Sequence, residues 1–146
     1  MTYQDTFVDT KEFRSLSRDS QVLSLYLLLG KVSLCGVAEF DEEMITFVLK
    51  MNESDLKKSL NELEGQKIIV FDRESDEIVF PNFIKGENPL KFSRSKAVKF
   101  RNDLLRVKSE AIKKGIENNY SKLVHAAKVS DTAGNQAGTP LKNLDN

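Results

Sequence analysis

Two helical patterns meet at Asn52 with almost no linker between them. The second pattern, NESDLKKSLNELEGQK, places Leu56, Leu60 and Leu63 on one side of a helix. Asn52 is a favourable N-cap residue, so the second helix is expected to start where the first one ends. Two helices joined by so short a turn cross at a steep angle, which predicts a helix-turn-helix. The first pattern, DEEMITFVLKM, repeats its apolar residues at the spacing of one helix face: Met44, Phe47, Val48 and Met51.

The next segment, KIIVFDRESDEIVFPNF at residues 67–83, predicts a β-hairpin. Strand-forming residues over 67–71 and 77–84 flank the turn RESD. A hairpin directly after a helix-turn-helix is typical of the wing of a winged helix. Its tip is acidic around a single Arg73, which favours contact with a protein over contact with phosphate; the acidic residues are Asp72, Glu74, Asp76 and Glu77.

Ahead of the helix-turn-helix, the segment SLSRDSQVLSLYLLLG predicts a further helix over residues 18–29. Ser17 is its candidate N-cap and Gly30 ends it. Because it is apolar on most sides, we expect it to be the buried central helix. The segment CGVAEF then predicts a short extended stretch. Together these patterns predict an α+β winged helix-turn-helix over residues 6–85.

The second part of the chain predicts a helical extension. Gly86 and Pro89 indicate a connector over 86–94, and a long basic helix is expected over 95–128. Its apolar stripe either packs within the chain or pairs with a second copy. In the second case the interacting residues would include Phe100, Leu104 and Val107. Residues 129–146 are polar and predict a disordered tail.

Composition excludes several classes of protein. The longest apolar run, residues 22–29, is too short to cross a bilayer, which favours a cytoplasmic protein. The single Cys35 provides neither a disulfide nor a thiol cluster for metal. Since no catalytic motif or phosphate-binding loop is present, we expect no enzyme activity, no cofactor, no metal, no membrane and no small-molecule substrate.

The third helix is the first candidate for contact with nucleic acid. Asparagine can pair with adenine in the major groove, and lysine with guanine or phosphate. The alternative is a face that is merely solvated. The face opposite the leucines carries these candidates: Ser54, Lys57, Lys58 and Asn61.

The C-terminal helix is the second candidate. Lys99, Arg106 and Lys113 recur every seven residues and predict a basic face roughly 20 Å long. Residues 1–85 contain 10 Lys and Arg against 16 Asp and Glu, whereas residues 86–146 contain 12 against 6. Docking of the basic helix on an acidic partner or on the acidic half is therefore an alternative to binding phosphate.

Beyond these patterns, a set of residues occurs in a distinctive order along the chain: Leu25, Tyr26, Leu27, Cys35, Gly36, Leu60, Leu63, Ile68, Ile69, Asn82, Phe83, Asn88 and Pro89. With these residues the chain resembles the N-terminal winged-helix domain of phage replication-initiation or replisome-organiser-like proteins. The resemblance covers about residues 6–110. It implies DNA binding by the helix-turn-helix and the wing, in the bacterial host cell of a phage or prophage.

The sequence therefore predicts a non-enzymatic protein of phage replication or regulation that binds duplex or single-stranded DNA. The third helix would enter a groove and the basic helix would neutralise phosphates. The alternative is a protein-interaction module that does not bind DNA. Such a module would be a phage regulator or inhibitor that contacts a host or replisome protein, or a homodimer.

Overall fold

The computed structural model describes residues 2–83 and 91–119. The chain divides into two compact units, residues 1–83 and residues 84–146, which are described separately. The predicted disordered tail, the connector before residue 91 and the end of the predicted long helix lie outside the described residues.

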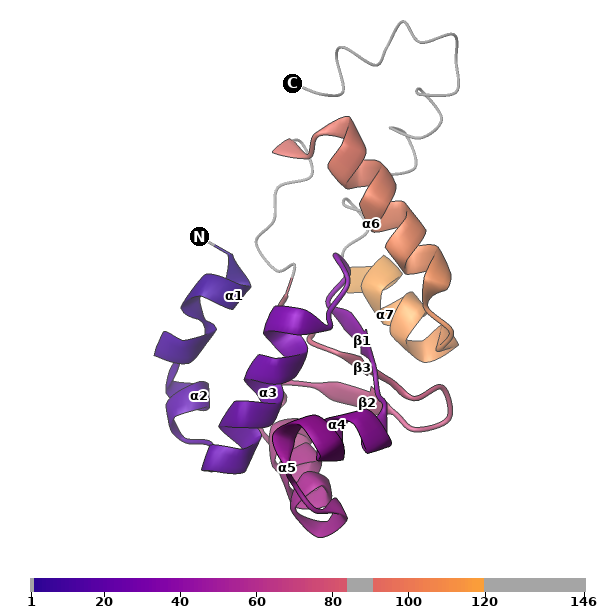
Figure 1. Cartoon of the computed structure of the whole chain (residues 1–146). Helices are drawn as coiled ribbons and strands as arrows, with labels where there is room; N and C mark the ends of the chain where they lie inside the picture. Colours follow the sequence, from indigo (N-terminus) through magenta and orange to yellow (C-terminus); the bar gives the residue numbers. More distant parts are fainter. Residues whose placement is uncertain (1, 84–90, 120–146) are drawn as a thin grey trace, which may run out of the picture. The chain divides into compact units, whose positions relative to one another are not determined.

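The first unit is an α+β fold in which helices pack on a small antiparallel sheet (Figure 1). The strand order is β1-β3-β2, so the last strand lies in the centre. Its elements are α1 (Tyr3–Thr6), the 3-10 helix η1 (Phe7–Asp9), α2 (Lys11–Arg14), α3 (Arg18–Gly30), β1 (Val37–Glu39), α4 (Glu42–Leu49), α5 (Glu53–Gly65), β2 (Val70–Asp72) and β3 (Glu77–Val79).

The three longest helices of this unit begin at polar caps. The side chains of Ser17, Asp41 and Asn52 accept a backbone N–H in the first turn of α3, α4 and α5, respectively. Lys50 ends α4 in the left-handed conformation, with φ 53°. Only residues 50–52 therefore separate α4 from α5, so the predicted pair of helices with a short turn between them is present.

The core of the first unit lies between α3, α5 and the sheet. Small residues allow the two helices to approach closely: Ser20 and Ser59 are both buried, and the Ser20 hydroxyl donates to the Ser59 carbonyl over 3.5 Å. The largest fully buried side chains of the unit include Phe7, Leu23, Leu27, Leu28, Leu56, Leu63, Ile69, Ile78 and Phe80.

Gly36 holds the entry to β1 against the end of the hairpin. Its φ is +76°, and its carbonyl accepts from the Phe80 N–H over 2.8 Å. An added Cβ would lie 2.6 Å from the Cβ of Phe83. Only glycine fits both the conformation and the space.

The second unit corrects the expectation of one continuous basic helix. It forms α6 (Arg94–Arg106) and α7 (Glu110–Asn119). Val107 leaves the helical conformation, with ψ 124°, and the Ser109 hydroxyl accepts the Ile112 N–H over 3.1 Å. Ser109 thus caps a new helix at a point where the apolar stripe alone predicts continuation.

Several other expectations can be compared with the structure. The helix over 18–29, the helix pair, the extended segment near 37–39 and the hairpin are confirmed, although both hairpin strands are shorter than predicted. The helices α1 and α2 were not predicted. The α+β fold is compatible with a winged helix. Within the described residues, no helix is long and apolar enough to cross a membrane.

Candidate nucleic-acid interface

The outward face of α5 carries the four residues that the sequence singled out. Ser54, Lys57, Lys58 and Asn61 are all exposed. Their spacing of i, i+3, i+4 and i+7 places them on one side of the helix, opposite the buried Leu56, Leu60 and Leu63. The structure therefore brings together two cations, an amide and a hydroxyl on one surface.

Glu62 lies beside this face but points to the N-terminus of α3. It accepts the Ser17 N–H over 3.2 Å, the Ser17 hydroxyl over 2.7 Å and the hydroxyl of Ser20. The hydrogen bond from Ser20, followed by those from Ser17, lowers the pKa of Glu62. The carboxylate thus neutralises the positive end of α3 rather than facing outward from α5.

Glu64, on the other side of the face, is paired with the hairpin. A nitrogen of the Arg73 guanidinium lies 2.7 Å from Glu64 Oε1, and the guanidinium stacks over the Phe71 ring at 4.6 Å from its centroid. The hydrogen bond to Glu64 raises the pKa of Arg73. Arg73 is more than half exposed, so solvent screens the pair, and it orients the hairpin more than it stabilises the fold. The one cation of the turn is consequently directed towards α5.

The four acidic residues at the hairpin differ in their surroundings. Glu74 and Asp76 are exposed at the turn, and Asp76 has a left-handed backbone with φ 54°. Asp72 Oδ1 accepts the Glu74 N–H over 3.0 Å and the Ser75 N–H over 3.3 Å, so this carboxylate stabilises the turn. Glu77 is buried in β3. Of the four residues predicted to contact a protein, Glu74 and Asp76 are the accessible pair.

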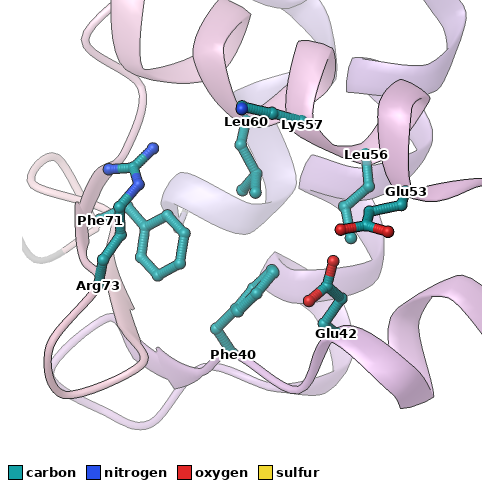
Figure 2. A pocket seen from close by; sticks show the side chains of 8 residues that line it. All are labelled: Phe40, Glu42, Glu53, Leu56, Lys57, Leu60, Phe71 and Arg73. Carbon is teal, nitrogen blue, oxygen red and sulfur yellow. The ribbon is translucent and has the colours of Figure 1, made fainter.

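A pocket lies between α5 and the hairpin (Figure 2). Its volume is about 200 Å³. The rings of Phe40 and Phe71 point into it, with centroids 4.7 Å apart, and Leu56 and Leu60 line it from α5. Two carboxylates and two cations also line the pocket, so it favours neither sign of charge. These four residues are Glu42, Glu53, Lys57 and Arg73.

In the second unit, the predicted basic stripe is divided between two helices. Lys99 and Arg106 of α6 both pair with the buried Asp103, at 3.3 Å and 4.0 Å, yet their side chains remain 64% and 81% exposed. Lys113 lies on α7, 3.9 Å from Glu110, and is only 25% exposed. The cationic surface of α6 is therefore shorter than predicted and contains a carboxylate.

The apolar stripe of the second unit is buried. Phe100, Leu104 and Val107 have exposed fractions of 0%, 6% and 4%. The stripe continues through Ile112 and Ile116, while Ala111 is exposed, because the break at residues 107–109 shifts the helix phase. A protein contact through these three residues stays a prediction.

The apolar residues of α4 are largely exposed. Of the four that recur at helical spacing, Met51 is buried, whereas Met44, Phe47 and Val48 are 47%, 81% and 45% exposed. Ile45 is buried instead, and Leu49 packs against the core. The sequence carries a signal for this result, because an eight-residue helix with apolar residues on all sides cannot bury all of them on one core.

Comparisons with family models, curated proteins and solved structures gave no match. Among the described residues, no group of His, Cys, Asp and Glu side chains is placed to hold a metal ion.

Proposed function

We propose that the first unit is a winged helix and that the protein binds nucleic acid with the outward face of α5. The observation that carries the proposal is the character of that face: Lys57, Lys58 and Asn61 are exposed, and the neighbouring Glu62 and Glu64 are held by other partners. A polyanion can approach such a face without meeting an unpaired carboxylate from these two positions.

Further support comes from the order of elements. A helix pair with a short turn, followed by a hairpin, is the arrangement in which the second helix enters the major groove. Lys99 and Arg106, which remain exposed on α6, would add contacts to phosphate. The resemblance stated above favours a non-enzymatic role in phage or prophage replication or regulation.

Fluorescence anisotropy with labelled duplex and single-stranded DNA tests this function. At about 50 mM salt we expect binding, and a Lys57→Ala/Lys58→Ala variant should raise Kd about tenfold or more and reduce the slope of log Kd against log salt by about two. Asn61→Ala should reduce discrimination between sites by about 1–3 kcal/mol.

The matched control is Lys11→Ala/Arg14→Ala, which removes two exposed charges from α2. It should leave both Kd and the salt slope close to those of the unmodified chain. Absence of binding to either form of DNA, or equal effects of the two double variants, would contradict the proposal.

A second candidate is the protein-interaction module. It is favoured by Glu74 and Asp76, which are exposed at the hairpin turn while Arg73 is bound to Glu64. A basic surface of a host or replisome protein would fit such a turn. Failure to bind DNA, together with capture of a protein that is lost on reversal of both charges, would favour this candidate.

A further inference from the structure

The exposed side of α4 is an apolar face that no other element of the first unit covers. Phe47 is the most exposed residue of this face, at 81%, and Met44 and Val48 are 47% and 45% exposed. Ile45, on the other side of the helix, is buried. Large apolar side chains grouped on one exposed helix face are typical of an interaction site.

The charges at the two ends of this face have opposite signs. Glu43, in the first turn, and Lys50, the C-terminal cap, are both exposed, and neither side chain has an ion-pair partner among the described residues. The midpoint between positions 43 and 50 of the sequence lies next to Phe47. Glu43 lies about one turn before Phe47, and Lys50, just past the end of α4, lies after it, so the two charges flank the apolar residues along the helix axis.

We infer that this face is the contact between two copies of the chain, with the two α4 helices antiparallel about a two-fold axis. That arrangement places Glu43 of each copy opposite Lys50 of the partner subunit and brings the two Phe47 rings together at the axis. A two-fold contact requires a surface complementary to itself, and this face satisfies the requirement in both charge and apolar content. The antiparallel helix dipoles add a further favourable contribution.

The same features argue against a different partner. A uniformly basic or acidic surface would match one end of the face and repel the other. The face is small, because an eight-residue helix is about 12 Å long. Such a contact lies at the low end of interface sizes, so the dimer should be weak and dependent on concentration. The inference does not depend on the proposed function.

Sedimentation velocity of the full chain between about 5 and 500 μM is the first test, with the range chosen for a small interface. The average mass should rise from the 16.5 kDa of the monomer towards twice that value. Phe47→Ser should weaken the dimer about tenfold or more. Leu29→Ser is the matched control, because Leu29 is 64% exposed at the end of α3, and it should change nothing.

Charge variants distinguish this arrangement from any other dimer. Glu43→Lys or Lys50→Glu alone should weaken self-association, because each places like charges together at both ends of the contact. The double variant should recover it, and an equimolar mixture of the two single variants should form a mixed dimer more readily than either forms its own.

Circular dichroism of each variant shows whether it is folded, so that a loss of association can be distinguished from unfolding. A concentration of about 500 μM is high enough to populate a weak dimer, so a chain that remains monomeric there overturns the inference. A dimer that folded Phe47→Ser leaves unchanged also overturns it, as does a failure of the double charge variant to recover association.

Discussion

The Glu62 carboxylate connects two helices by hydrogen bonds. It belongs to α5, but its hydrogen-bond partners are Ser17 and Ser20 at the start of α3, 45 and 42 residues away in sequence. A carboxylate that accepts several hydrogen bonds is stabilised in its charged form. The residue therefore supports the packing of α3 on α5 and leaves the outward face of α5 with less negative charge.

The lowered pKa of Glu62 predicts a pH-dependent contribution to stability. Because the pKa in the folded state lies below the ordinary value of 4.5, the contribution is complete above that pH and is lost as the pH falls through the folded-state pKa. Glu62→Gln should lower the free energy of unfolding by about 1–2 kcal/mol near neutral pH, and by less in acid. Urea unfolding at several pH values measures this.

Glu74→Gln is the control for this experiment, since the Glu74 side chain is exposed at the hairpin turn. Its stability should follow that of the unmodified chain at every pH. If Glu62→Gln were equally destabilising in acid and at neutral pH, the hydrogen bonds to the charged form would not be the cause.

At the level of elements, the hairpin presents acidic rather than basic side chains at its turn. Its cation is held by Glu64, and its accessible acids are Glu74 and Asp76. If α5 carries the nucleic-acid contact, the tip should lie away from phosphate.

We therefore expect that Glu74→Lys/Asp76→Asn leaves DNA binding no weaker and makes it at most a few-fold tighter, through the more favourable field. Asparagine is chosen at position 76 because it tolerates the left-handed backbone. The measurement is the anisotropy titration described above. Weaker binding would mean that the two carboxylates take part in the contact.

Some helices of the first unit can be predicted from the sequence and others cannot. The helices α3, α4 and α5 could be predicted because Ser17, Asp41 and Asn52 mark their starts. The four-residue helices α1 and α2 could not, since they are too short for a periodic pattern and depend on packing of residues such as Phe7.

For similar reasons, the sequence predicts the α5 face of the candidate site but not the contacts around it. The outward face of α5 follows from the positions of its leucines, so its four residues could be named in advance. The partners of Glu62 and Glu64 are distant in sequence, and the exposure of Phe47 depends on which side of α4 meets the core. The break before Ser109 was hidden because apolar spacing continues across it.

For the molecule as a whole, the net charge of zero conceals an acidic first part and a basic second part. A neutral chain gains little long-range attraction to DNA, so the proposed binding would rest on local cationic surfaces and would depend strongly on salt. Lys99 and Arg106 are the exposed cations of the predicted stripe, whereas Lys113 is mostly covered.

This difference predicts that Lys99→Ala/Arg106→Ala lowers the magnitude of the salt slope by up to about two, and that adding Lys113→Ala changes it little further. The salt titration compares the double and triple variants directly. An unchanged slope in the triple variant would remove the second unit from the DNA contact, and a large additional effect of Lys113→Ala would contradict the exposure argument.

Because β3 lies in the centre of the sheet, its position affects when the sheet can form during synthesis of the chain. Val79 pairs with both Val37 and Val70, so neither outer strand has a partner in the sheet until residues 77–79 have left the ribosome. The segments that form α3, α4 and α5 are synthesised before that point, so their sheet-facing side chains have no sheet to pack against until then. The three-stranded sheet can therefore form only after β3 has been synthesised, so we expect folding of the nascent first unit to depend on this short strand.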